Sequence, residues 1–252
     1  MKEIVSSKNP IVSHLTALKK EKRYRKETGL VLVEGKNLVK DLLEKRKAKR
    51  LFVTKDFAEV NASLLKKLQT EELYLLSDPI LQKITSTESP EGILAEVPMP
   101  KESDLRGKKR ILALDRIQDP GNLGTLIRSA LAFGWEGIFL IEPCCDPFND
   151  KALRAAKGAT FFIPLQNGNW ETLQDIAKAN KLSFFVADLE GISFEKAPKT
   201  DTMILVLGNE AEGVSPPQNL RATQITIPME QKTESLNVAV AGGILLYALR
   251  NK

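Results

Sequence analysis

The stretch RILALDRIQDPGNLGTLIRSALAFG, residues 110–134, decides the fold class. It opens with an apolar run at residues 110–117, which predicts a strand that is buried on both faces. A turn rich in proline and glycine follows, and residues 123–133 then carry apolar side chains at helical spacing until Gly134 ends the predicted helix. A buried strand that passes through a tight turn into a helix is typical of a parallel sheet.

The same alternation continues to the end of the chain. Further strands are predicted at residues 137–142, 161–165, 182–188, 202–208 and 224–228. Further helices are predicted at residues 149–157, 171–180 and 235–250. Buried strands separated by helices in this order predict an α/β domain of three layers, with a parallel sheet in the middle.

A smaller α/β unit is predicted before this stretch. Its strands are expected at residues 30–34, 50–54, 73–77 and 92–98, and its helices at residues 35–47, 62–68 and 78–85. Residues 98–109 combine two prolines, a glycine and mixed charge, which is typical of a linker. We therefore predict an N-terminal domain at residues 1–98, a linker at 99–109 and a second domain at 110–252. The length of 252 residues suits two domains, with a single large domain as the alternative.

The positive charge is concentrated at the front of the chain. Residues 1–110 hold 24 Lys+Arg and 16 Asp+Glu, whereas residues 111–252 hold 13 and 16, so a formal net charge of +5 hides a balance of +8 against −3. Such an asymmetry suits a basic N-terminal domain that binds a polyanion. A lysine-rich solvated surface is the alternative.

The sequence lacks the residues that several kinds of active site and binding site require. The only histidine is His14, which we expect to be a surface side chain, so catalytic triads and histidine-metal centres are excluded and no metal site is predicted. The two cysteines, Cys144 and Cys145, are adjacent and too few for a structural zinc site. The glycine patterns of dinucleotide-binding and P-loop proteins are absent.

The sequence carries no signal for export or for a membrane. The first twenty residues have no apolar core followed by a small-residue cleavage site, and no apolar run approaches the ~20 residues that span a bilayer. We therefore expect a cytoplasmic protein that does not associate with a membrane.

Three segments follow predicted strands, at the sheet edge where parallel α/β folds bind ligands. They are DPGNLGTLIRSA at residues 119–130, LGNEAEGVS at 207–215 and IPMEQKTESLNVAVAGG at 227–243. Together they resemble the three motifs of the SpoU/TrmH family of RNA ribose 2′-O-methyltransferases, within the SPOUT superfamily. The motif residues are Asn122-Leu123-Gly124 with Arg128, then Gly208-Asn209-Glu210 with Gly213, then Ile227-Pro228-Met229 with Ser235-Leu236-Asn237.

The resemblance, which covers roughly residues 110–250, implies a fold and a cofactor. The second domain is expected to thread its carboxyl-terminal part into a deep trefoil knot, an exception to the rule against threaded loops. That knot would bind S-adenosyl-L-methionine, largely through backbone groups of the second and third motifs. The cofactor-binding residues carried over from the family are Leu207, Gly208, Ile227, Met229 and Leu236. Glycine lets a backbone approach a ligand, and the apolar side chains suit an adenine, although plain core packing is the alternative for Ile227 and Leu236.

The resemblance also implies the reaction, which is methyl transfer to a ribose 2′-hydroxyl. Its catalytic candidates are Arg128, Asn122, Glu210, Ser235 and Asn237. In the family the arginine of the first motif has a base-like role beside a substrate phosphate and comes from the partner subunit, and the alternative for Arg128 is a phosphate clamp. Asn122 and Glu210 are expected to hold the active-site loop, with helix capping by Asn122 as the alternative.

The partners follow from the same resemblance. Structured RNA is the expected substrate, with rRNA favoured and tRNA as the alternative, and the basic N-terminal domain resembles the family's substrate-binding domain. A homodimer through the second domain would cover the last predicted helix, which is apolar nearly all round and rich in small residues, namely Ala239, Ala241, Gly242 and Gly243. Two other classes stay open. They are a non-catalytic RNA-binding or ribosome-assembly protein with the same fold, and a methyltransferase acting on a base or a protein.

Overall fold

A computed structural model of the chain describes residues 2–85, 87–230 and 235–250, and its contacts divide the protein into two compact units. The first unit comprises residues 1–100 together with 148–161, and the second comprises 101–147 together with 162–252. The sequence pattern places residues 148–161 inside the second domain. They group with the first unit because Leu153 and Phe161 are each only 2% exposed and belong to its apolar core.

The first unit is built on a mixed five-stranded sheet. The strands lie in the order β1 (Lys2–Ile4), β4 (Thr70–Leu76), β3 (Ala48–Val53), β5 (Ile93–Pro98) and β2 (Leu30–Glu34). Strand β5 runs antiparallel to both of its neighbours, whereas β1, β4 and β3 are mutually parallel. This sheet confirms the small α/β unit predicted from the sequence.

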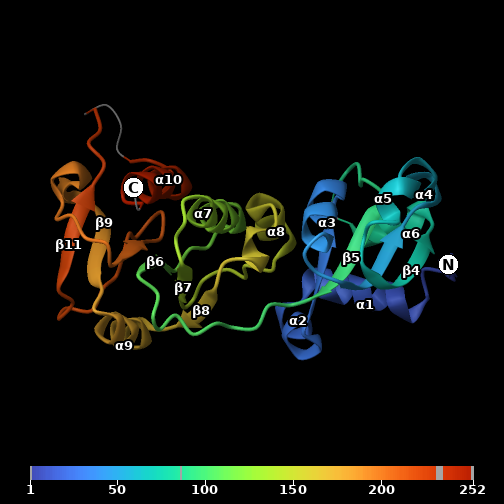
Figure 1. Cartoon of the computed structure of the whole chain (residues 1–252), viewed down its shortest axis with the longest axis horizontal. Helices are drawn as coiled ribbons and strands as arrows, with labels where there is room; N and C mark the ends of the chain where they lie inside the picture. Colours follow the sequence, from blue (N-terminus) through green and yellow to red (C-terminus); the bar gives the residue numbers. More distant parts are fainter. Residues whose placement is uncertain (1, 86, 231–234, 251–252) are drawn as a thin grey trace. The chain divides into compact units, whose positions relative to one another are not determined.

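Helices cover both faces of that sheet (Figure 1). One face packs against α3 (Lys36–Leu43), α4 (Lys55–Val60) and α8 (Asp150–Ala156), and the other against α1 (Pro10–Lys20) and α6 (Asp78–Ile84). The remaining helical segments are α2 (Lys22–Thr28), α5 (Ala62–Leu65) and the 3₁₀ turn η1 (Ala159–Phe161). Strand β1 and helix α4 lie outside the sequence prediction, and the predicted helix 62–68 forms only over the four residues of α5.

The prediction that His14 is a surface side chain is wrong. Its ring is 18% exposed, its Nδ1 lies 2.8 Å from the hydroxyl of Tyr24, and its Nε2 lies 3.2 Å from the fully buried carboxylate of Glu96. The guanidinium of Arg50 lies 3.4 Å from the same carboxylate. A buried carboxylate needs such partners, so the partly buried histidine helps to satisfy Glu96.

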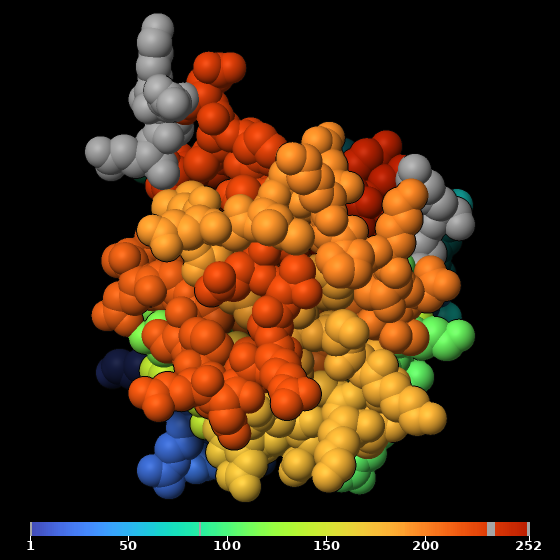
Figure 2. Space-filling model, turned by 90° about the vertical axis from the view of Figure 1, so that its left-hand side faces the viewer, coloured from blue at the N-terminus to red at the C-terminus, as the bar shows by residue number. Residues whose placement is uncertain are grey.

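The second unit contains a six-stranded sheet in which every pairing is parallel. Its strands follow the order β11 (Ala222–Thr226), β9 (Ser183–Ser193), β10 (Met203–Leu207), β6 (Arg110–Asp115), β7 (Gly137–Ile141) and β8 (Leu165–Gly168). Strands β10, β6 and β7 are buried at every position, as continuous apolar runs predict. Strand β11 is an edge strand, and it and β9 lie at the face seen in Figure 2.

Two helices cover one face of this sheet and one covers the other (Figure 1). Helices α7 (Pro120–Ala132) and α10 (Val238–Ala248) pack together on one side, and α9 (Trp170–Asn180) lies on the other, with a short 3₁₀ turn η2 (Phe194–Lys196) after β9. The predicted three-layer α/β domain is confirmed, while the trefoil knot stays a prediction. No helix of the described residues is long and apolar enough to cross a membrane.

The small residues of α10 have different roles. A Cβ atom on Gly242 would collide with Leu126 of α7 and lie 2.7 Å from Leu207 of β10, so this glycine allows the helix to pack closely. A Cβ atom on Gly243 would meet nothing within 4 Å of the same chain. Close approach inside the unit is therefore confirmed for Gly242 alone of these two.

The strand predicted at residues 161–165 is wrong. Strand β8 begins only at Leu165 and continues through polar residues to Gly168. Phe161 instead ends η1 and stacks edge to face with Phe148, with ring centroids 6.0 Å apart. Its apolar character therefore serves the core of the first unit and not the sheet of the second.

Candidate functional site

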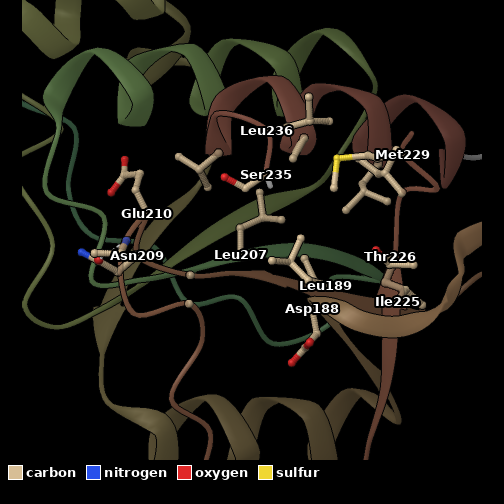
Figure 3. Close-up of a pocket in the computed structure, with 18 residues that line it drawn as sticks. Asp188, Leu189, Leu207, Asn209, Glu210, Ile225, Thr226, Met229, Ser235 and Leu236 are labelled. Atoms are coloured by element: carbon tan, nitrogen blue, oxygen red, sulfur yellow. Dashed lines mark hydrogen bonds between the residues drawn. The ribbon is translucent and has the colours of Figure 1, made fainter. Parts of the chain in front are cut away.

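A pocket in the second unit is lined by the ends of β10 and β11, by the middle of β9 between them, and by α10 with the residues before it. Strand β10 ends at Leu207 and strand β11 at Thr226, and residues after both line the pocket. Figure 3 shows Glu210 at one end and Met229 at the other, with Leu207 and Leu236 between them. The second and third sequence motifs thus meet at one cavity.

All five residues predicted to bind the cofactor line this pocket. They are Leu207, Gly208, Ile227, Met229 and Leu236. Leu207 is 1% exposed and also packs under Gly242, so it serves the core as well as the cavity. The other four are partly exposed, which is what residues at a cavity wall require.

Sequence reasoning missed a second group of lining residues. Asp188, Leu189, Ile225 and Thr226 come from β9 and β11. The signal was available, because ligands of open parallel sheets bind at the carboxyl ends of strands, and Asp188 ends the predicted strand 182–188. Its carboxylate accepts a hydrogen bond from the N–H of Glu190 at 2.9 Å.

Three of the predicted catalytic residues, one from each motif, form a chain of hydrogen bonds. Nδ2 of Asn122 donates to Oε1 of Glu210 at 2.6 Å, and Nδ2 of Asn237 donates to Oδ1 of Asn122 at 3.1 Å. Oδ1 of Asn237 accepts from the N–H groups of Ala239 and Val240 and so caps helix α10. The structure therefore brings the three motifs together through side chains of residues that the sequence singles out.

Helix capping by Asn122, the alternative considered from the sequence, is wrong. Helix α7 begins at Pro120, and its cap is Asp119, whose carboxylate accepts from the N–H of Asn122 at 2.8 Å. A proline in the first turn suits this start, because the N–H groups of the first turn have no acceptor within the helix and the N–H that proline lacks is therefore not needed. The side chain of Asn122 is consequently available for Glu210 and Asn237.

Gly208 of the second motif is required by the fold of its own loop, and its expected role in approaching the cofactor stays a prediction. A Cβ atom on Gly208 would collide with the backbone of Gly213, so the loop needs glycine in order to fold back on itself. The N–H of Gly213 donates to the carbonyl of Asn209 at 2.9 Å and closes this turn. Gly213 has φ of +67°, a left-handed conformation that glycine adopts without strain.

The two remaining catalytic candidates, Arg128 and Ser235, do not belong to this chain of hydrogen bonds. Ser235 lines the pocket. Arg128 is exposed on α7 and does not line the pocket, and among the described residues it forms no hydrogen bond or ion pair. Arg128 lies six positions after Asn122 on the helix, which places the two side chains on different faces of α7.

The cysteine pair is unsuited to nucleophilic chemistry at Cys145. Burial, with smaller contributions from Cys144 and neighbouring carboxylates, raises the pKa of Cys145 to about 12. The described residues contain no group of three or more side chains able to hold a metal ion. The polar groups at the pocket are therefore carboxylates, amides, hydroxyls and backbone.

Two family models match the chain. The SpoU rRNA Methylase family matches residues 109–247, and the MRM3-like substrate binding domain matches residues 9–95. The 23S rRNA (guanosine(2553)-2′-O)-methyltransferase RlmP of Bacillus subtilis is 36% identical over 99% of this chain and 100% of its own length.

Solved structures agree with these matches. The AdoMet-bound rRNA methyltransferase of Sinorhizobium meliloti aligns with a TM-score of 0.83 and 31% identity, covering 98% of this chain and 97% of that one. The SpoU methyltransferase AviRb of Streptomyces viridochromogenes, in complex with AdoMet, aligns with a TM-score of 0.85 and 25% identity, covering 96% of this chain and 97% of that one. These matches show that the chain belongs to the SpoU rRNA methylase family, whose three motifs the structure joins by hydrogen bonds.

Proposed function

We propose that the protein transfers a methyl group from S-adenosyl-L-methionine to a ribose 2′-hydroxyl of rRNA. The observation that carries this proposal is that the second and third motifs line one pocket and that hydrogen bonds of Asn122 with Glu210 and Asn237 join the first motif to them. The name of the Bacillus subtilis relative specifies this chemistry on 23S rRNA and supports rRNA over tRNA.

The lining of the pocket fits the cofactor. Leu207, Ile227, Met229 and Leu236 offer apolar surface for an adenine, and the backbone around Gly208 is free of side-chain bulk. The carboxylate of Glu210, at one end of the pocket, provides negative charge that suits a cationic ligand, whereas the carboxylate of Asp188 points away from the other labelled side chains (Figure 3). When bound, S-adenosyl-L-methionine supplies a methyl group that is already activated by its sulfonium charge.

The remaining requirement is a hydroxyl that is oriented and can lose its proton. We assign this task to Arg128, which acts on the 2′-hydroxyl or on the phosphate beside it. Asn122, Glu210 and Asn237 hold the surrounding loops in place, since their side chains bond to one another. Ser235, at the pocket wall, contacts the substrate or the cofactor through its hydroxyl.

A homodimer completes this site in the proposal. Arg128 lies outside the pocket of its own chain, and this supports the family arrangement in which the arginine acts in the partner's site. Helix α10 also exposes an apolar face, with Val240 51%, Ile244 39% and Tyr247 54% exposed. Such a stripe at helical spacing suits an interface between two copies. The cytoplasmic location stays a prediction from the sequence.

The test is direct detection of the product. Purified protein is incubated with ribosomal RNA or with tRNA and with S-adenosyl-L-methionine labelled in its methyl group, and the nucleosides are separated after digestion. Label in 2′-O-methyl nucleosides from rRNA is expected. Label in base-methylated nucleosides, or label in tRNA alone, would contradict the proposal. RNA binding without any transfer would favour a ribosome-assembly protein.

A further inference from the structure

Arg116 lies in the turn between β6 and α7. Its φ of +56° is a backbone conformation that residues other than glycine rarely adopt. Two hydrogen bonds hold the peptide groups on either side of it. Its N–H donates to the carbonyl of Ile141 at 3.4 Å, and its own carbonyl accepts from Nδ2 of Asn209 at 3.1 Å. The unusual conformation is therefore fixed by its surroundings, which is typical of functional sites.

The guanidinium of Arg116 reaches the loop at residues 208–215, which we call the pocket loop. Nη1 donates to Oε2 of Glu212, and Nη2 lies 2.6 Å from Oγ of Ser215. Nε donates to Oδ1 of Asp115 at 3.2 Å, and the other oxygen of this buried carboxylate accepts from the N–H of Ser215 at 2.8 Å. One side chain thus joins the end of β6 to the far end of the pocket loop.

The first half of the pocket loop is held by Asn122, which bonds Glu210, and by Oδ1 of Asn209, which accepts from the N–H groups of Ala211 and Glu212. Arg116 holds its second half, through Glu212 and Ser215. Residues 210–213 are exposed, and Glu210, Ala211 and Gly213 line the cofactor pocket. Neither Arg116 nor Glu212 lines it. Desolvation opposes the charge of Arg116, but the carboxylates of Asp115 and Glu212 raise its pKa above the ordinary value, so the guanidinium stays charged.

We propose that Arg116 is a positioning residue, which holds the pocket loop in the form that binds S-adenosyl-L-methionine. The proposal rests on the proposed function and adds to it a residue outside the three motifs. A planar fork of donors can bond Asp115, Glu212 and Ser215 at the same time, whereas a lysine cannot. Since Arg116 acts through the loop and not on the reacting atoms, its loss weakens cofactor binding and leaves the transfer step itself unchanged.

The test compares cofactor affinity with turnover. In Arg116→Asn the new residue tolerates a positive φ but lacks the fork, so the Kd for S-adenosyl-L-methionine, measured by calorimetry, is expected to rise about tenfold or more. The kcat at saturating cofactor should stay close to that of the wild type. Arg116→Lys should restore part of the affinity. The matched control is Arg106→Asn, at an exposed arginine whose guanidinium lies 3.8 Å from the carboxylate of Asp104, and it should bind like the wild type.

The outcomes separate this inference from the function on which it rests. Wild-type affinity in Arg116→Asn would overturn the inference, and so would a loss of kcat at saturating cofactor, because it would place Arg116 in the transfer step. If Arg116→Asn does not fold, Glu212→Gln replaces it, since that change weakens one contact from the loop side, and unchanged affinity there would overturn the inference equally. A wild-type protein that binds no S-adenosyl-L-methionine would instead refute the proposed function.

Discussion

Nδ2 of Asn237 donates to Oδ1 of Asn122 at 3.1 Å, although the two residues are 115 positions apart. The direction of this bond is determined by the cap of α10, because Oδ1 of Asn237 already accepts from the N–H groups of Ala239 and Val240. The amide of Asn122 is then oriented in turn, with its Nδ2 toward Glu210. Each amide has one orientation, so the three motifs form a single oriented chain.

This chain predicts the effect of Asn122→Ala. Losing both hydrogen bonds should lower kcat about tenfold or more, while the free energy of unfolding falls by only about 1 kcal/mol. The kinetics are measured with saturating cofactor and RNA, and stability by urea unfolding. Asn169→Ala is the matched control, because it removes the cap of α9 at a similar cost in stability. Equal activity of the two variants would contradict a role for Asn122 in the site.

Arg128→Ala should abolish methyl transfer and leave the cofactor Kd unchanged, because Arg128 is exposed and lies outside the pocket. Arg128→Lys separates the two candidate roles: partial activity indicates an electrostatic role, and negligible activity indicates a geometric or base-like one. Mixing Arg128→Ala with Gly208→Ala, whose added methyl group collides with the pocket loop, should restore activity at one of two sites if the arginine acts across a dimer. Full activity of Arg128→Ala alone would refute the mechanism.

The exposed face of α10 predicts a dimer that a single charge disrupts. Val240→Glu should raise the dimer dissociation constant about 100-fold or more, because it would bury an unpaired carboxylate in the interface. Light scattering after size-exclusion chromatography measures the change, and circular dichroism checks that the fold is retained. Val60→Glu, at a valine that is 82% exposed in the first unit, should stay dimeric. A wild-type protein that is monomeric and active at micromolar concentration would exclude the dimer.

The basic first unit predicts the source of RNA affinity. Fewer cationic side chains are available to bind RNA than the sequence suggests, because Arg25 is buried and Lys19 pairs with Glu34 at 2.7 Å. The test variant therefore changes only exposed lysines to glutamine, at positions Lys20, Lys22 and Lys26. It should weaken RNA binding and flatten the dependence of log K on log salt by about 0.7–0.9 for each phosphate that no longer meets a lysine.

The control for this experiment changes as many lysines in the second unit, namely Lys178, Lys196 and Lys199. Equal effects of the two triple variants would show that RNA affinity does not come from the first unit. Deleting residues 1–98 is a poorer test, because it would remove the core that covers Leu153 and Phe161.

The raised pKa of the Cys145 thiol predicts an unusual pH dependence of its alkylation rate. With its pKa raised to about 12 by burial, the thiolate fraction grows about tenfold per pH unit and has no plateau between about pH 7.5 and 9.5. The rate of reaction with iodoacetamide, followed by mass spectrometry in Cys144→Ser, should rise in the same way. Protein unfolded in urea should show a plateau near about pH 9, and a plateau there in the folded protein would disprove the raised pKa.

The sheet of the second unit was predictable because its signal is local. Strand β10 is buried at all five positions, so its sequence is an unbroken apolar run. Strand β1 has no such signal, since two of its three residues are charged and exposed. An apolar run also does not reveal which part of the protein it packs against. For this reason the sequence predicts a strand at Phe161, although this side chain packs in the core of the first unit.

The site was predictable to the extent that motif spacing reports it. Leu207 and Glu210 are identified because a family pattern marks them, and their side chains line one pocket. Arg116 is not identified from the sequence, because its role depends on a positive φ and on partners about 100 positions away, at Glu212 and Ser215. Neither property leaves a trace in the nearby sequence.

The grouping of residues 148–161 with the first unit has a consequence for how such proteins can be recombined. The chain passes between the two units three times, after residues 100, 147 and 161. An N-terminal domain taken from a relative and joined at one point would receive α8 and η1 from the wrong parent, and Leu153 and Phe161 would enter a foreign core. A working chimera has to exchange residues 1–100 and 148–161 together, so this unit can be replaced only as two separate segments of the chain.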